Sequence, residues 1–220
     1  MYIGEHLSTL YTEITPNDSV AHALELLNDL HVHQLPLILN QEYLGILSEE
    51  ELLNIDQDSL LLKDIQFNLP FIYVYDFQHI YDAIQLISIN QLDLLPILNK
   101  QNQYLGVVTQ QDLLYAINKM ISNQEIGAII VLEMEERDHS LTHIANIIES
   151  ENAKIWSTGV KQVEDSDKIE LTIKLNKTNI SSVLASLWRH DYVVKATFND
   201  GSDQNDIQDR YNLLMNYLNL

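Results

Sequence analysis

Two short segments place an acid three residues after a hydroxyl, a spacing that supports chemistry at the start of a helix. Ser48 precedes Glu51, and Thr109 precedes Asp112. In the first turn of a helix such a pair forms a capping box, in which each side chain accepts a hydrogen bond from a backbone N–H group. The same turn presents free N–H groups and a partial positive charge, which attract an anion. The residues alone therefore leave two alternatives, a structural cap and an anion-binding site.

These segments are copies of one another, because the chain contains an internal duplication. Residues 35–53 read LPLILNQEYLGILSEEELL, and residues 95–114 read LPILNKQNQYLGVVTQQDLL. The prolines are 60 positions apart, whereas Gly45 and Gly106 are 61 apart, so the second copy has gained one residue. Turns accept such insertions more readily than strands do. Each copy therefore predicts a strand, a polar turn, a second strand and a helix that begins at the hydroxyl residue.

An amphipathic helix is predicted before each copy. Apolar residues recur at i, i+3, i+4 and i+7 over residues 20–27 and again over residues 80–87. A short strand should precede each helix, over residues 11–15 and 71–75. Residues 54–63 are a polar and then apolar linker that runs into an LKDI sequence, which we expect to lead into the second copy. Each repeat is thus a predicted β-α-β-β-α unit, and the two should pack together pseudo-symmetrically.

The duplicated pattern, LP with apolar residues followed by G-h-h-[ST]-x-x-[DE]-L, resembles the tandem CBS domain pair, named after cystathionine β-synthase. The resemblance covers about residues 1–122, with repeats expected at 1–57 and 58–122. It implies a regulatory module, not a catalyst, that binds an adenosine nucleotide between the repeats. Such a module requires no cofactor, and the nucleotide is a regulatory ligand.

The resemblance also assigns roles to the residues at the helix starts. In this family the acid binds the ribose hydroxyls and the hydroxyl residue contacts phosphate. Asp112 matches the family's ribose ligand, whereas Glu is the usual partner in a pure capping box. The predicted nucleotide-binding residues are Gly106, Val108, Thr109 and Asp112, and the predicted weaker second site consists of Ser48 and Glu51.

The charge of this region favours a ligand with few phosphates. Residues 1–122 contain only Lys63, Lys100 and Lys119 as bases, against 16 acids, and three glutamates crowd the first helix start at 49–51. Carboxylates repel phosphate, and they repel a triphosphate more strongly than a monophosphate. We therefore expect AMP or a related adenosine compound in preference to ATP, unless Mg²⁺ bridges the phosphates and the acids.

A third module is predicted over residues 126–200. Strands are expected over 127–134, 153–160, 168–175 and 192–198, with helical stripes over 141–148 and 180–187. This βαββαβ order is that of the ferredoxin-like split unit, so the predicted fold class is α/β (α+β). After a CBS pair the module resembles an ACT domain, and the whole arrangement is similar to the acetoin-utilisation regulatory protein family.

One loop of the third module departs from that resemblance. ACT domains that bind amino acids usually carry a Gly between the first strand and the first helix, but residues 136–141 read ERDHSL. Amino-acid binding and dimerisation are both open as roles, and we favour dimerisation because a fold does not fix a function. An amphipathic helix is predicted over residues 203–220, packed on its own domain or on a neighbouring subunit.

Two histidines near the first copy are candidate metal ligands. His31 and His33 would point the same way if the backbone between them is extended; otherwise they lie solvated in a helix-to-strand connection. No acid or histidine at a regular spacing completes a coordination sphere around them. We therefore predict no metal site.

Composition narrows the function classes. The net charge of −20 repels nucleic acid and anionic membranes, so neither is an expected partner. The sequence has no Cys, no apolar stretch long enough for a bilayer, no nucleophile-base spacing and no phosphate-binding loop. We predict a cytoplasmic, homodimeric regulator that is not an enzyme and that acts on an unidentified protein. The alternative is an interaction module with degenerate nucleotide sites.

Overall fold

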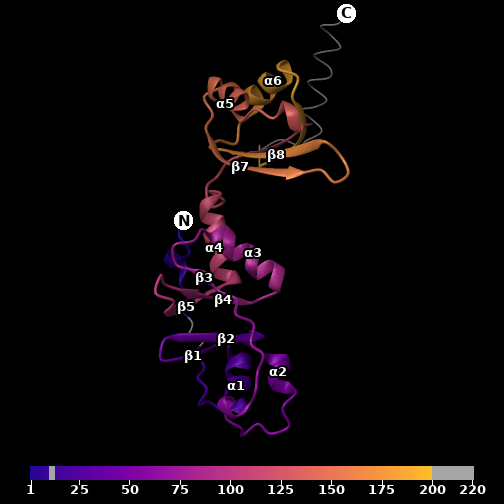
Figure 1. Ribbon diagram of the computed structural model, residues 1–220. Helices are drawn as coiled ribbons and strands as arrows, with labels where there is room; N and C mark the ends of the chain where they lie inside the picture. Colours follow the sequence, from indigo (N-terminus) through magenta and orange to yellow (C-terminus); the bar gives the residue numbers. More distant parts are fainter. Residues whose placement is uncertain (10–12, 200–220) are drawn as a thin grey trace, which may run out of the picture. The chain divides into compact units, whose positions relative to one another are not determined.

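The chain divides into two units, Met1–Ile117 and Asn118–Leu220, in the computed structural model, which describes residues 1–9 and 13–199 (Figure 1). The helix predicted over 203–220 lies outside the described residues. Helices and strands are mixed in both units, so the predicted α/β (α+β) class is confirmed. None of the described helices combines the length and the apolar character needed to span a bilayer.

The first repeat follows the predicted order closely. Its elements are α1 (Val20–Leu30), β1 (Gln34–Leu39), β2 (Glu42–Ser48) and α2 (Glu49–Leu53). β1 and β2 form an antiparallel hairpin in which Leu35 pairs with Leu47. Of the strand predicted over 11–15, the described part contains an isolated parallel bridge between Ile14 and Leu37. The buried face of α1 is the predicted apolar stripe, because Val20, Ala23 and Leu27 are almost fully excluded from solvent.

The second repeat has the same order with a longer final helix. Its elements are β3 (Val74–Tyr75), α3 (Ile80–Asn90), β4 (Leu94–Leu98), β5 (Tyr104–Thr109) and α4 (Gln110–Met120). The three strands form one sheet in the order β3-β4-β5, with β3 parallel and β5 antiparallel to β4. This arrangement places the hydroxyl of Thr109 at the end of a buried strand and at the start of a helix.

The predicted strand over 71–75 is shorter than expected, since only its last two residues pair with β4. The preceding residues are tied to the first repeat instead. The Ile46 amide donates to the Pro70 carbonyl at 3.0 Å, and the Tyr43 hydroxyl donates to the Ile72 carbonyl at 2.7 Å. Because these contacts hold the backbone before residue 73, it cannot continue the ladder along β4.

The segments that lead into the repeats are exchanged between them. The 3-10 turn η1 (Ile3–His6) packs on the second repeat, where its first amide donates to the Gln78 carbonyl at 2.9 Å. The 3-10 turn η2 (Leu62–Asp64) packs on the first repeat, where its first amide donates to the Asp18 carbonyl at 2.9 Å. LKDI precedes the second copy in the sequence, but it packs on the first repeat, because Leu62 is buried in the core of the first repeat.

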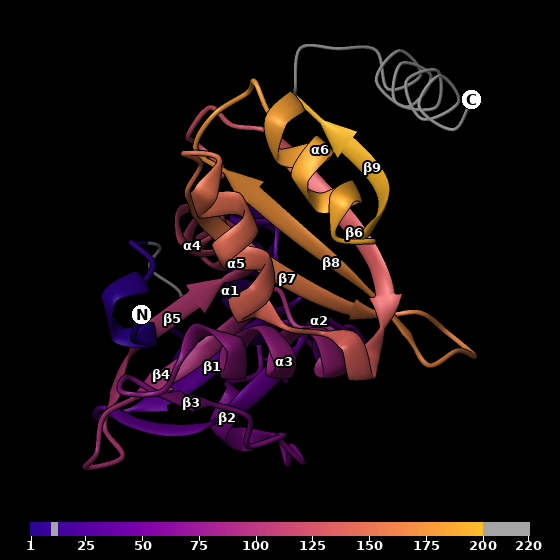
Figure 2. The ribbon, with the colours of Figure 1, turned by 90° about the horizontal axis from the view of Figure 1, so that it is seen from above.

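The second unit contains the predicted βαββαβ order. Its elements are β6 (Ile129–Glu135), η3 (Glu136–Asp138), α5 (Leu141–Ser150), β7 (Ile155–Gln162), β8 (Lys168–Leu175), α6 (Ser181–Arg189) and β9 (Val193–Phe198). The sheet order β7-β8-β6-β9 is fully antiparallel, which is the ferredoxin-like arrangement. Figure 2 shows α5 and α6 on the same face of this sheet.

The core of the second unit lies between that face and the two helices. Alternate residues of β8 point into it, and Leu171, Ile173 and Leu175 are fully buried. Ile144 and Ile148 of α5, which are four residues apart, complete the same cluster. The period of two along β8 and of 3.6 along α5 therefore predicted the correct faces.

Candidate functional site

A cavity of about 490 Å³ opens at the start of α4 in the second repeat. Its walls come from two segments that are distant in sequence, the N-terminal residues 5–9 and the first turns of α4. The lining residues from α4 and its cap are Thr109, Gln111, Asp112 and Tyr115. The cavity therefore contains the hydroxyl and the acid that the sequence predicted as nucleotide-binding residues.

Thr109 and Asp112 form a complete capping box. The backbone amide and the hydroxyl of Thr109 both donate to Oδ2 of Asp112, at 3.0 and 2.6 Å. In return, the Asp112 amide donates to the Thr109 hydroxyl at 3.1 Å. Three hydrogen bonds thus stabilise the helix start without any ligand.

The cap leaves part of the Asp112 carboxylate available. Both bonds from Thr109 end on Oδ2, and a carboxylate has two oxygens with about four acceptor positions between them. Oδ1 can therefore accept hydrogen bonds from a molecule in the cavity while the cap stays intact. Capping and ligand binding are compatible at this position.

Gly106 and Val108 are placed differently from the other predicted site residues. The Val108 side chain is fully buried, and neither residue is among those that line the cavity. Gly106 has φ +144°, a conformation that favours glycine, and a Cβ atom there would lie 3.1 Å from Cδ2 of Leu7. Gly106 therefore allows the N-terminal segment to approach β5, and a direct ligand contact by either residue stays a prediction.

The N-terminal segment, which had no predicted role in the site, supplies five of the lining residues. Ser8 is held there by its amide, which donates to the Val107 carbonyl at 2.8 Å. Nε2 of His6 is buried and has no hydrogen-bond partner among the described residues. The sequence carries no local signal for this role, because the segment reaches the cavity only through its contacts with the second repeat.

The corresponding residues of the first repeat form the same cap. The Ser48 amide and hydroxyl donate to Oε2 of Glu51 at 3.2 and 3.0 Å, and the Glu51 amide donates to the Ser48 hydroxyl at 3.3 Å. The capping box expected there is confirmed. Asp112 and Glu51 thus make the same capping hydrogen bonds. The shorter side chain of Asp112 does not distinguish its helix start from that of the first repeat.

The crossing segment of the first repeat packs more tightly against the strand glycine that precedes its cap. A Cβ atom on Gly45, which has φ +143°, would lie 2.5 Å from Cβ of Leu69 and 3.2 Å from the Pro70 carbonyl oxygen. Leu69, Phe67 and Ile65 are partly buried and pack against the core of the first repeat. The crossing segment of the first repeat is therefore an apolar packing element.

The two repeats meet at a pair of equivalent positions. Nδ1 of His33 lies 2.8 Å from Oδ2 of Asp93, which also accepts the His33 amide at 2.8 Å. Hydrogen bonding to Asp93 and its negative charge raise the pKa of His33. His31 is the left-handed C-cap of α1. His33 is thus neither a simply solvated side chain nor part of a metal site, because it is exposed but paired with Asp93. No cluster of three metal-binding side chains occurs in the described ranges.

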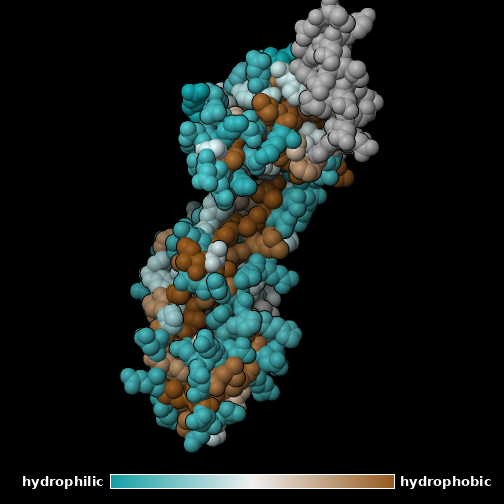
Figure 3. Space-filling model, turned by 90° about the vertical axis from the view of Figure 1, so that its right-hand side faces the viewer, coloured by the Kyte–Doolittle hydropathy of each residue, from teal (hydrophilic) through white to brown (hydrophobic). Residues whose placement is uncertain are grey.

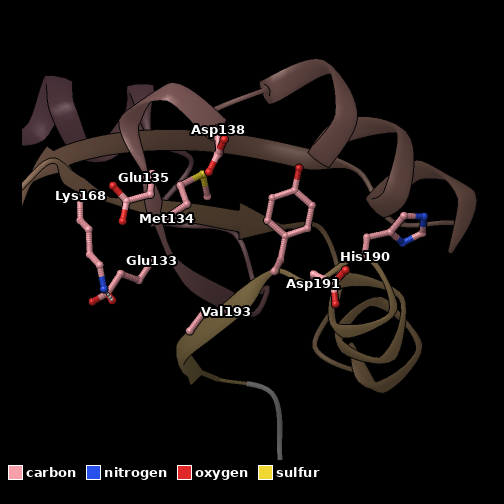
Figure 4. A pocket seen from close by; sticks show the side chains of 9 residues that line it. Glu133, Met134, Glu135, Asp138, Lys168, His190, Asp191 and Val193 are labelled. Atoms are coloured by element: carbon pink, nitrogen blue, oxygen red, sulfur yellow. Dashed lines mark hydrogen bonds and ion pairs between the residues drawn. The ribbon is translucent and has the colours of Figure 1, made fainter.

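A second cavity, of about 400 Å³, lies in the ferredoxin-like unit. It is lined by residues 133–135 of β6, Asp138, Lys168 and residues 190–193. Figure 4 shows the Lys168 ammonium directed at Glu133, and the two groups are 2.8 Å apart. This hydrogen bond lowers the pKa of Glu133 and raises the pKa of Lys168. Because the single lysine in the lining is already paired, the remaining carboxylates make this cavity unsuitable for an anion.

Comparison with known proteins identifies the first half of the chain. The family described as CBS domain matches residues 11–58 and again residues 62–119. Inosine-5'-monophosphate dehydrogenase from Korarchaeum cryptofilum is 26% identical over 102 residues, which are 46% of this chain and 21% of that protein. The match thus spans about a fifth of the relative's length.

Solved structures of other proteins are also similar to part of this chain. A CBS domain pair/ACT domain protein from Thermotoga maritima is 20% identical, with a TM-score of 0.48, and covers 54% of this chain and 98% of its own. CBSX2 of Arabidopsis thaliana, in a complex with AMP, is 23% identical, with a TM-score of 0.45, and covers 54% and 96%. The two consecutive family matches coincide with the duplicated β-α-β-β-α units, and the first half of the chain is a tandem pair of CBS domains.

Proposed function

We propose that the protein is a non-catalytic regulatory module that binds an adenosine ligand, AMP or a related compound, in the cavity at the start of α4. One observation carries this proposal: Oδ1 of Asp112 is free of the cap while its carboxylate lines the cavity. Ribose offers two adjacent hydroxyl donors, which suit a carboxylate acceptor. A volume of about 490 Å³ is within the usual range of about 300 to 1,000 Å³ for small-molecule sites.

The remaining walls suit the rest of an adenosine. Leu7 and Tyr115 add apolar and aromatic surface on opposite segments of the lining, and Ser8 and Thr9 add polar groups. Small-molecule sites combine such surface with a few polar groups that fix orientation. The proposed roles are therefore ribose binding by Asp112 and purine packing by Leu7 and Tyr115.

A thermal-shift series with adenosine compounds tests this proposal. A ligand that binds only the native state raises the free energy of unfolding by mass action, by about 2.7 kcal/mol at a concentration of 100 Kd, and the melting temperature rises with it. We expect AMP to raise it and metal-free ATP to raise it less. A flat response to the whole series would instead favour the second candidate function, an interaction module in which both capping boxes are purely structural.

We also propose that the protein acts as a homodimer on an unidentified partner, with an ACT-like second unit whose main role is dimerisation. Large apolar side chains on α3 and α4 are exposed, with 59% for Tyr81, 69% for Ile89 and 61% for Leu114. Figure 3 shows apolar residues interspersed among hydrophilic ones on one side of the molecule. Both helices belong to the second CBS repeat, so burial of these residues favours a symmetric interface between two CBS pairs. Sedimentation that showed only monomer at micromolar concentration would exclude it.

A further inference from the structure

We infer that the cavity at the start of α4 selects adenosine ligands by charge, and that it takes the phosphate-free nucleoside in preference to AMP, ADP or ATP. The inference rests on the proposed function, since it concerns the same cavity. It goes further by naming the class of ligand from two features of the cavity. The cap already uses most hydrogen-bond donors at the helix start, and the lining has no lysine or arginine among its described residues.

The first feature is the number of donors that the helix start has left for a phosphate. The single hydroxyl hydrogen of Thr109 goes to Asp112, and so does the Thr109 amide. The amide of Gln110 donates to the Asp93 carbonyl at 3.0 Å, and the amide of Asp112 donates back to Thr109. At most the amide of Gln111 remains among residues 109–112. A phosphate has three acceptor oxygens, so this helix start has too few free N–H groups to bind it as an uncapped helix start would.

The second feature is the charge of the cavity walls. Glu5 and Asp112 are both in the lining, which contains no lysine or arginine among its described residues. Two like unit charges about 6 Å apart in water repel one another enough to lower an affinity about threefold. A phosphate dianion beside these carboxylates therefore lowers affinity, and each additional phosphate lowers it further.

The bases of the CBS pair cannot compensate, because all three are placed elsewhere. Nζ of Lys63 bonds Oδ1 of Asn17 at 3.1 Å in the first repeat, and Nζ of Lys100 lies 5.3 Å from the centre of the Phe77 ring. Lys119 lies in the last turn of α4. A helix rises about 1.5 Å per residue, so Lys119 is roughly 15 Å along the axis from Thr109.

A neutral nucleoside keeps the favourable contacts and avoids both penalties. Its ribose hydroxyls donate to Oδ1 of Asp112, and its purine packs against Leu7 and Tyr115. The nucleoside can therefore make these contacts with Asp112, Leu7 and Tyr115 without placing a negative charge beside the carboxylates.

Isothermal titration of the full chain with adenosine, AMP, ADP and ATP tests the inference. In EDTA and at low salt, adenosine should bind most tightly, and the affinity should fall about threefold or more with each phosphate. Mg²⁺ should recover part of the ATP affinity. If AMP or ATP binds more tightly than adenosine in EDTA, the inference is overturned and the proposed function stands. If none of the four binds the folded protein, the proposed function itself fails.

A pair of variants isolates the cause. Glu5→Gln removes one lining carboxylate and should raise the affinity for AMP about threefold to tenfold, with adenosine unchanged. Glu25→Gln is the matched control, since Glu25 is an exposed residue of α1 in the first repeat and its loss changes the net charge equally. Charge selection is refuted if Glu5→Gln leaves AMP affinity unchanged, or if both variants alter it alike.

Discussion

The two CBS repeats share one cap and differ in the segment that crosses over to face it. Ser48 with Glu51 and Thr109 with Asp112 make the same set of three hydrogen bonds. The segment that crosses to the first repeat supplies Ile65, Phe67 and Leu69, which pack on its core, whereas the mainly polar residues 5–9 line the cavity beside the second cap. The duplication therefore sets the helix start, and the crossing segment is what differs between the repeats.

The helices that follow the caps differ as well. α2 has five residues and begins with three glutamates, whereas α4 has eleven residues and only Asp112 as an acid in its first turn. Fewer carboxylates beside the second cap therefore repel a phosphate of the ligand less than the three glutamates beside the first cap would. This difference favours the second repeat as the binding repeat.

The largest expected effect concerns the two strand glycines. Gly45→Ala should destabilise the protein by about 2 to 5 kcal/mol, because a positive φ and a 2.5 Å approach to Leu69 act together. Gly106→Ala should cost about 1 to 3 kcal/mol, since its nearest contact is the flexible end of Leu7 at 3.1 Å. Urea unfolding followed by circular dichroism measures both. A larger loss of stability for Gly106→Ala than for Gly45→Ala would contradict the tighter packing around Gly45.

A smaller effect, of similar size in both repeats, is expected from removing the hydroxyls of the caps. Ser48→Ala and Thr109→Ala should each lower the free energy of unfolding by about 0.5 to 2 kcal/mol. The hydrogen bonds are the same in number and type, but Thr109→Ala also removes a buried methyl group and should therefore cost up to about 0.8 kcal/mol more than Ser48→Ala. Thermal unfolding without ligand checks this, and a negligible effect of Thr109→Ala would mean that the second cap is not structural.

The smallest effect concerns the contact between the repeats and depends on pH. The pKa of His33 is raised in the folded state by Asp93, so its contribution to stability is present below the ordinary pKa of about 6.5 and is lost as the pH rises through the folded value. His33→Gln should therefore lower the melting temperature slightly at about pH 5.5 and less at about pH 8.5. The side chain is exposed, so the effect is modest.

His31→Gln is the control for that experiment. Position 91 of the second repeat has the same left-handed C-cap conformation as position 31 and is already Gln. The substitution should therefore leave the pH dependence as it is in the unmodified protein. An equal change in both variants would remove the special role of the pair between His33 and Asp93.

The sequence predicted those parts of the fold that repeat or alternate. The duplication gave the hairpins and the caps, and the period of two along residues 169–175 gave the buried face of β8, because both signals are local. The exchange of η1 and η2 was not predictable in this way. It depends on contacts such as the amide of Leu62 with the Asp18 carbonyl, which join segments more than forty positions apart.

The candidate site was predicted in part for the same reason. Thr109 and Asp112 share one helix turn, so their spacing was sufficient to place them together. Glu5 and His6 reach the same cavity only through the crossing segment, and nothing in their own neighbourhood in the sequence signals it. Residues 71–73 were assigned to a strand on apolar character, but Tyr43 and Ile46 of the first repeat hold the backbone around them.

The most direct test of the account is the affinity of adenosine and AMP for Asp112→Asn and Glu51→Gln, measured by titration calorimetry. Each substitution should lower stability by about 0.5 to 1 kcal/mol through its cap. Asp112→Asn should also weaken binding about ten- to a hundredfold, since a charged acceptor to two hydroxyls is lost, whereas Glu51→Gln should leave the affinity unchanged. A loss of binding in Glu51→Gln alone, or in neither variant, would contradict the assignment of the ligand to the second repeat.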